Sequence, residues 1–182
     1  MKVIAICGSP RKGNTEQMLR WVLDACKAGG ADVELVKLRE LDIKHCNGCN
    51  SCYGEDRPCV IDDDMEHVIS KLLEADAVVF GSPNYFNNVS GLMKDFIDRT
   101  NSIAEPSKLN GKVAGVVSVG ARAAEETGAV AGILEGYAKI MDMVSVGSVV
   151  AQAEDPGEVS KKENIKLACT DLGNKIADRL GS

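Results

Sequence analysis

Apolar runs alternate with amphipathic segments along this chain, and the alternation predicts secondary structure. Three runs are continuous and bounded by turn residues, which is typical of strands buried on both faces: residues 3–7, 77–80 and 112–119. Two further strands, 33–38 and 144–149, are interrupted by charged or small polar residues, which is typical of sheet edges. Apolar positions at helical spacing predict five helices: about residues 15–28, a segment starting at 62–64, 91–100, 125–141 and 160–180.

Strand and helix therefore alternate five times. This order favours a parallel sheet with helices on both faces and right-handed crossovers. Placing the two edge-like strands outermost gives the order 2-1-3-4-5, which is the flavodoxin-like, doubly wound α/β arrangement. We expect a single flavodoxin-like domain over residues 1–182, with a cysteine-rich loop at 45–61.

Charge and hydropathy narrow the function classes. The 182 residues include 21 Lys and Arg against 27 Asp and Glu, a formal net charge of −6, and the basic residues are scattered. This balance argues against nucleic acid or an anionic membrane as the partner. The apolar run at the N-terminus is too short for a signal peptide, and no run approaches the roughly 18 residues of a membrane span, so we expect a cytoplasmic protein.

Three loops of the predicted sheet open at the carboxyl ends of strands 1, 3 and 4, where ligands bind in such folds. The first, residues 8–15, precedes a helix, whose free N–H groups attract phosphate. It matches neither a Walker A loop nor a dinucleotide fingerprint, so a monoester phosphate suits it best, or else it is a plain turn. Its candidate ligand-binding residues are Ser9, Arg11, Gly13, Asn14 and Thr15.

The other two loops suit a planar, partly polar ring. The second combines aromatic and amide side chains, which can pack on such a ring and reach its edge, or else belong to the core or a subunit contact. Glycine in the third allows close backbone approach, and its arginine either lies near the ring or is simply solvated. The candidates here are Ser82, Pro83, Asn84, Tyr85, Phe86, Asn87, Gly120, Ala121 and Arg122.

Taken together, these motifs resemble the NADPH-dependent FMN reductase family. The resemblance rests on Gly8-Ser9-Pro10-Arg11-x-Gly13-Asn14-Thr15, on Ser82-Pro83-x-Tyr85 and on Lys94-x-Phe96-Ile97-Asp98-Arg99, and it extends to about residue 134. It implies non-covalently bound FMN, with the phosphate on residues 9–15 and the ring between 82–87 and 120–122. Relatives often have glycines after the arginine of the third loop, whereas here Arg122-Ala123-Ala124-Glu125-Glu126 follows.

Cysteine is abundant, with seven residues, and in a reducing compartment this indicates metal or redox chemistry. Cys7, Cys26 and Cys169 lie on apolar faces and are expected to be buried. Cys46, Cys49, Cys52 and Cys59 form the pattern C-x2-C-x2-C-x6-C. This compact spacing favours one cluster over zinc, which usually takes two separated C-x2-C pairs; free thiols or a redox disulfide are the other readings. The pattern resembles the iron–sulfur flavoproteins, which implies a [4Fe–4S] cluster beside the FMN.

The resulting hypothesis is a flavin-dependent oxidoreductase that passes electrons between FMN and a [4Fe–4S] cluster. The flavin carries the chemistry, so we assign no catalytic side chain. Reduced nicotinamide, NAD(P)H, or a carrier protein such as ferredoxin is the expected partner, and the family resemblance implies a homodimer or homotetramer. The alternatives are an NAD(P)H-dependent FMN or quinone reductase without a cluster, a non-enzymatic flavodoxin-like carrier and a zinc-stabilised interaction module.

Overall fold

The computed structural model describes residues 1–54 and 57–181, without the side chains of residues 124–126. Within these residues, one parallel sheet has the order β2-β1-β3-β4-β5, as predicted. Its strands are β1 (Lys2–Cys7), β2 (Asp32–Lys37), β3 (Ala77–Pro83), β4 (Val113–Gly120) and β5 (Val144–Gln152). The helices are α1 (Asn14–Ala28), α2 (Met65–Glu74), α3 (Gly91–Arg99), α4 (Ala124–Ile140) and α5 (Glu163–Gly181).

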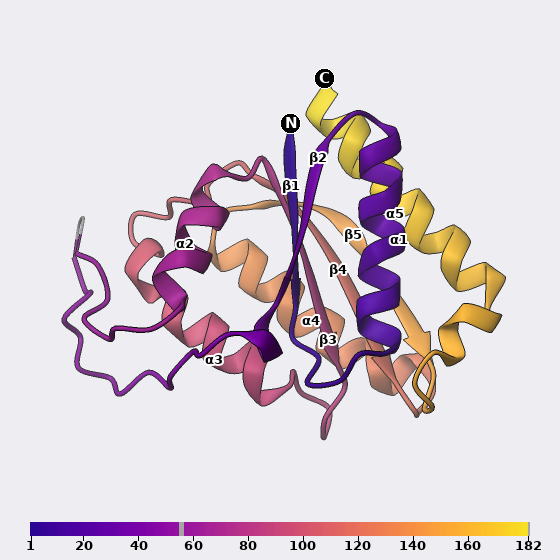
Figure 1. Ribbon diagram of the computed structural model, residues 1–182, viewed down its shortest axis with the longest axis horizontal. Coiled ribbons are helices and arrows are strands. Elements are labelled where there is room, and N and C mark those ends of the chain that lie inside the picture. The colour runs from indigo at the N-terminus through magenta and orange to yellow at the C-terminus, as the bar shows by residue number, and fades with distance from the viewer. Residues whose placement is uncertain (55–56, 182) are drawn as a thin grey trace.

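The helices cover both faces of the sheet (Figure 1). Side chains alternate along each strand, so Val3, Ala5 and Cys7 of β1 pack toward α1 and α5. Ile4 and Ile6 point to the other face, where α2, α3 and α4 lie. The inner strands β1, β3 and β4 are therefore apolar at nearly every position, and this explains why continuous runs predicted them correctly.

The predicted boundaries differ from the observed ones mainly at polar ends. Helix α2 begins at Met65, just after the predicted start at 62–64. The carboxylate of Asp63 lies before the helix and accepts the Met65 N–H at 3.0 Å, as a capping side chain does. Strand β5 runs three residues further than predicted, and a short 3-10 helix (Glu158–Lys161) precedes α5. None of the described helices is long and apolar enough to cross a membrane.

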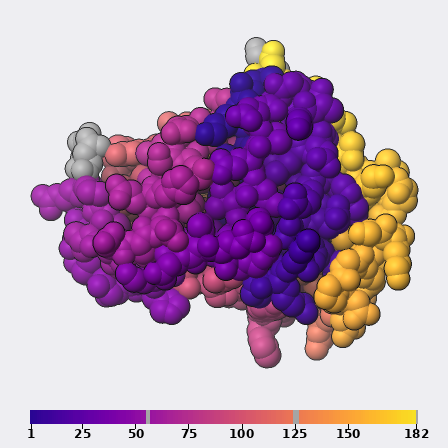
Figure 2. Space-filling model, in the orientation of Figure 1, coloured from indigo at the N-terminus to yellow at the C-terminus, as the bar shows by residue number. Residues whose placement is uncertain are grey.

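Because all strands are parallel, their carboxyl ends share one edge of the sheet. Cys7, Pro83, Gly120 and Gln152 end β1, β3, β4 and β5 there, at the lower end of the view in Figure 1. The segment that holds the four clustered cysteines follows β2 and extends sideways past α3, away from α1 and α5 (Figure 2).

Candidate functional site

The β1–α1 loop is folded by its own side chains. Ser9 Oγ donates to the Arg11 carbonyl at 2.8 Å and accepts the Arg11 N–H at 3.2 Å. Gly13 is the N-cap of α1 and supplies no capping side chain, so the first N–H groups of the helix face the loop. An N-terminus of this kind, with the exposed Arg11 beside it, is a suitable place for a phosphate.

Ser90 joins this loop to the next one. Its hydroxyl donates to the Gly8 carbonyl at 2.5 Å and accepts the Met93 N–H, which caps α3, at 3.2 Å. The Ser90 N–H in turn donates to Ser82 Oγ at 3.0 Å. Ser82 is fully buried and lines neither of the two cavities described below. Unlike the other predicted ligand-binding residues, it supports the β3–α3 loop through its hydrogen bond with Ser90.

The β3–α3 loop carries a two-residue hairpin. Tyr85 and Asn88 exchange backbone hydrogen bonds of 3.0 and 3.1 Å across Phe86 and Asn87. Both turn residues have positive φ, 54° and 58°, which is uncommon for phenylalanine. Phe86 is also fully exposed, and the hairpin protrudes from the surface in Figure 2. A strained turn that presents an aromatic ring to solvent is characteristic of a functional loop.

Gly120 brings the third loop against the second. A Cβ at this position would lie 2.9 Å from both Asn84 Cβ and Thr127 Oγ1, so only glycine allows this approach. The Asn84 N–H donates to the Val119 carbonyl at 2.8 Å, which locks the two loops side by side. The backbone here forms a cradle that a larger residue would fill.

Two adjoining cavities lie over these loops. One of about 280 Å³ is lined by the five candidates of the first loop together with Pro83, Asn84, Tyr85, Gly120 and Ala121. The other, of about 530 Å³, is lined by Asn84, Tyr85, Phe86, Asn87, Ala121 and Arg122. Every predicted ligand-binding residue except Ser82 therefore lines this paired cavity. The side chains of residues 124–126, where the family pattern departs, lie outside the described part.

The segment after β5 also contributes, although none of the sequence motifs includes it. Ala153, Glu154 and Pro156 line the smaller cavity. Asn14 holds this segment: its Nδ2 donates to the Asp155 carbonyl at 2.9 Å, and its Oδ1 accepts the Val159 N–H at 3.2 Å. Both polar atoms of the Asn14 side chain are thus hydrogen-bonded within the protein. The segment after β5 could have been predicted from the sequence as part of the site, because it follows a parallel strand at the carboxyl edge of the sheet.

Glu158 fixes the same segment electrostatically. Its carboxylate accepts the Glu154 N–H at 2.8 Å and pairs with Lys162 at 2.8 Å. The hydrogen bond from Lys162 and that from the Glu154 N–H lower the pKa of Glu158 to about 2. The Glu154 backbone is therefore held in place where it borders the cavity.

A closed stem carries the cysteine loop, residues 45–61. The stem consists of residues 42–44 and 61–64, joined by the Asp42 N–H to Asp64 at 2.7 Å and the Lys44 N–H to Asp63 at 2.9 Å. Arg99 closes it from α3, donating to the Lys44 carbonyl at 2.8 Å and to the Asp63 carboxylate at 2.5 and 3.0 Å. Residues 62–64 thus form hydrogen bonds within the stem in addition to preceding helix α2, where the sequence predicted them.

The four thiols of this loop do not enclose a metal in the structure. Cys46 and Cys49 are exposed, whereas Cys52 and Cys59 are partly buried. Among residues 1–54 and 57–181, no three His, Cys, Asp or Glu side chains are close enough to hold one ion. The donor type and spacing suit an iron–sulfur cluster, but this placement of the sulfurs does not fit one. Cys7, Cys26 and Cys169 are buried, as predicted, and burial raises the pKa of each thiol.

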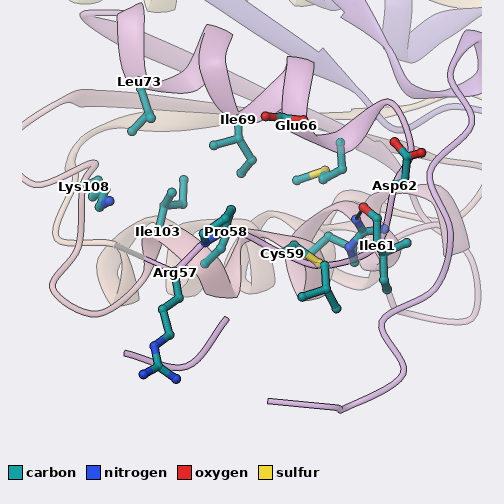
Figure 3. Close-up of a pocket in the computed structure, with 14 residues that line it drawn as sticks. Arg57, Pro58, Cys59, Ile61, Asp62, Glu66, Ile69, Leu73, Ile103 and Lys108 are labelled. Carbon is teal, nitrogen blue, oxygen red and sulfur yellow. Dashed lines mark hydrogen bonds between the residues drawn. The ribbon is translucent and has the colours of Figure 1, made fainter. Parts of the chain in front are cut away.

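A third cavity, of about 390 Å³, lies under the cysteine loop (Figure 3). Ile69 and Leu73 of α2 face Pro58 and Cys59 of the loop across it, and Arg99 also lines it. Among the described residues, none that lines this cavity also lines the two cavities at the carboxyl edge of the sheet. Of the four predicted metal ligands, Cys59 is the one that lines this cavity.

The doubly wound sheet is flavodoxin-like, and comparison with known proteins makes the chain a flavin-dependent oxidoreductase. Comparison with known families gives the particular one: the family described as NADPH-dependent FMN reductase matches residues 1–156, and the chain belongs to it. The sequence resemblance is thereby confirmed.

Individual relatives agree with this placement. An iron-sulfur flavoprotein of Archaeoglobus fulgidus is 39% identical over 100% of this chain and 81% of its own length. An iron-sulfur flavoprotein of Methanocaldococcus jannaschii is 41% identical over 66% of this chain, and the match spans 63% of that protein. Part of the second relative thus has no counterpart in this match.

Solved structures support the fold. A flavone reductase superposes with a TM-score of 0.73 at 22% identity, covering 98% of this chain and 62% of that one. A flavodoxin from the domain Archaea has a TM-score of 0.66 at 18% identity and covers 100% of both chains. At these identities the likeness establishes the flavodoxin-like architecture.

Proposed function

We propose that the chain binds FMN in the paired cavity at the carboxyl edge and transfers electrons between it and a reduced nicotinamide or a carrier protein. The observation that supports this most is the convergence of three loops, far apart in the sequence, on adjoining cavities of about 280 and 530 Å³. One has the features of a phosphate site and the other those of a ring site, at the place where this fold binds ligands.

The residues of the site have distinct tasks in this proposal. The first turn of α1 and Arg11 bind the phosphate through N–H groups and a positive charge. Tyr85 and Phe86 cover the ring and exclude water, while Gly120 lets the backbone approach it closely. Arg122 places a cation at the ring end of the cavity. When bound, FMN supplies the hydride and electron exchange.

The finer part of the proposal concerns the cysteine loop. The spacing of Cys46, Cys49, Cys52 and Cys59 and the names of the iron-sulfur relatives support a [4Fe–4S] cluster on these thiols. Because the sulfurs do not converge in the structure, metal loading would have to draw the loop together.

A second candidate is a reductase of the same family without a cluster. The exposure of Cys46 and Cys49 favours it, because thiols that point to solvent are free for other chemistry. A homodimer or homotetramer, with the exposed Phe86 near an interface, remains part of either proposal. The oligomeric state is tested by measuring the mass of the FMN-loaded protein by light scattering.

The deciding experiment is the content of FMN, iron and acid-labile sulfide in protein purified without oxygen. About four irons and four sulfides per FMN support the full proposal. FMN without iron, together with rapid NAD(P)H oxidation, supports the reductase without a cluster. A stable semiquinone without nicotinamide turnover would identify a carrier, and zinc without flavin would overturn the proposal.

A further inference from the structure

The cavity of about 390 Å³ lies apart from the proposed FMN site and has the size of a ligand site of its own. Helix α2 bounds it on one side and the 3-10 helix Thr100–Ile103 on another, and residues 57–62 complete it (Figure 3). Its volume falls in the range of small-molecule sites, about 300–1,000 Å³. A molecule of about one or two rings would fit such a volume.

The walls of this cavity are apolar at its centre and at its opening. Ile69 and Leu73 of α2 point toward Ile103 across the centre (Figure 3). Leu73 and Val60 both line the cavity and are nevertheless 39% and 65% exposed. Exposed apolar side chains around a hollow mark binding surfaces, and an apolar ligand would remove them from water.

One polar group at the cavity has no partner. Arg99 lines the cavity, and its side chain is 1% exposed. Its two terminal nitrogens donate to the Asp63 carboxylate and to the Lys44 and Ile61 carbonyls. Its Nε–H is buried and has no hydrogen-bond partner within the part of the chain that the structure describes. A buried N–H without an acceptor costs free energy, so an acceptor atom on a ligand would stabilise this group.

The apolar walls decide what kind of acceptor suits that N–H. A water molecule needs two to four polar partners, which walls of isoleucine and leucine do not supply. An oxygen carried on an apolar molecule meets both requirements at once. Because Nε is itself covered, the oxygen reaches it only with a change of rotamer in the wall, which is common on binding.

The charges around the cavity favour a neutral ligand. Arg57 and Lys108 line it together with Asp62 and Glu66, so two cations balance two acids. The positive charge of Arg99 is already neutralised by its buried ion pair. An ion would therefore gain no net attraction from the lining and would lose its solvation on entering the apolar centre.

We propose that this cavity is a second binding site, for a neutral, ring-sized apolar molecule that carries a carbonyl oxygen, such as an aromatic ketone. The apolar body of the ligand packs against Ile69, Leu73 and Ile103. Its carbonyl oxygen accepts the Nε–H of Arg99. The site goes beyond the proposed function, because none of these residues lines the paired cavity.

The first test compares two ligands of the same shape. It uses the full-length protein loaded with FMN, with the isoleucine Cδ1 methyl groups labelled with ¹³C. The probe is 1-indanone, and indane, which has CH₂ in place of the carbonyl, is the matched compound. We expect 1-indanone to shift the methyl signals of Ile69 and Ile103, while that of the exposed Ile140 on α4 stays unchanged.

The dissociation constants from these titrations separate a specific site from simple partition. Indane is the more apolar compound, so partition alone would make it bind more tightly. We expect it to bind several-fold more weakly than 1-indanone, because it leaves the Arg99 N–H without an acceptor. Equal or tighter binding of indane overturns the role of Arg99. No shift at Ile69 and Ile103 overturns the site, and tighter binding of indane-1-carboxylate overturns the choice of a neutral ligand.

Variants of the wall give the second test. Leu73→Glu places a carboxylate at the apolar opening and should weaken 1-indanone several-fold. Leu167→Glu, the same change at a leucine 61% exposed on α5, is the matched control and should bind normally. Arg99→Lys keeps the charge but has no Nε–H, so it should bring the affinities of 1-indanone and indane together. A retained preference for 1-indanone in that variant overturns the hydrogen bond.

Failure of this inference is distinguishable from failure of the proposed function. FMN content is measured in the same samples by its absorbance after denaturation. Protein that retains no FMN overturns the proposed function, whereas the methyl signals of Ile69 and Ile103 still decide on this site. If Arg99→Lys does not fold, the comparison of the two ligands on the wild type decides the role of Arg99.

Discussion

The Arg99 guanidinium and the Asp63 carboxylate form a bidentate ion pair with both side chains buried, at 2.5 and 3.0 Å. Burial raises the pKa of Asp63, but the hydrogen bonds from Arg99 and from the Lys44 N–H outweigh it and lower the pKa to about 2. The pair joins α3 to the stem of the cysteine loop across 36 residues of sequence. Removing either partner leaves a buried charge without its counterpart.

Arg99→Met is expected to lower the free energy of unfolding by about 3–5 kcal/mol, because it strands the Asp63 carboxylate. Urea denaturation followed by circular dichroism measures the loss. The double variant Asp63→Asn with Arg99→Met removes the stranded charge and should recover part of the stability. A cost below about 1 kcal/mol for the single variant, the range of exposed pairs, would contradict a buried, coupled pair.

Asp63 also predicts how stability depends on pH. Its pKa falls from an ordinary 3.8 to about 2 on folding, so the stabilisation is fully present above the unfolded value and is lost as the pH drops from about 4 toward 2. The shift corresponds to about 2 kcal/mol. Denaturation midpoints of the wild type and of Asp63→Asn, measured between pH 6 and 2, should show this component in the wild type only. Parallel curves for the two proteins would count against it.

Gly120→Ala should weaken FMN binding by about tenfold or more, because the new Cβ would displace Asn84 from the cavity wall. Flavin fluorescence quenching gives the dissociation constant. Gly136→Ala on α4 is the matched control: nothing lies within 4 Å of its Cβ, and alanine should stabilise the helix by about 0.5–1 kcal/mol. Equal FMN affinity in the Gly120 variant and the wild type would show that the cradle is not part of the FMN site.

Replacing Phe86 should raise the stability of the protein and weaken its binding of FMN. Asparagine tolerates positive φ, so Phe86→Asn is expected to raise the free energy of unfolding by about 0.5–1 kcal/mol while weakening the interaction with the flavin ring. Asn87→Gly relaxes the same turn but keeps the aromatic ring, and it should gain stability without the loss in binding. If both variants bind FMN equally well, Phe86 does not cover the ring.

Much of the fold follows from the alternation of apolar and polar residues. Strands β1, β3 and β4 are apolar at nearly every position because both faces are covered, and this pattern predicted their place at the centre of the sheet. The convergence of the three loops followed from parallel strands sharing one carboxyl edge. These inferences needed only local pattern and topology.

Other parts of the site depend on contacts that no local pattern encodes. Arg99 was visible only as the last residue of a family motif, and Asp63 only as one of three acids before a helix. The engagement of Asn14 with the Asp155 carbonyl spans 141 residues. The positions of the four cysteine sulfurs depend on loop geometry, which the spacing of the residues leaves open.

The closed stem has a consequence for how this loop can vary. The two segments of the stem are joined to each other and to Arg99, so the residues between them begin and end at fixed points. The entropy of closing such a loop rises only slowly with its length. Insertions or exchanges between residues 45 and 60 would therefore leave the sheet and the paired cavity intact. A segment anchored at both ends in this way can be exchanged as a unit between homologous proteins.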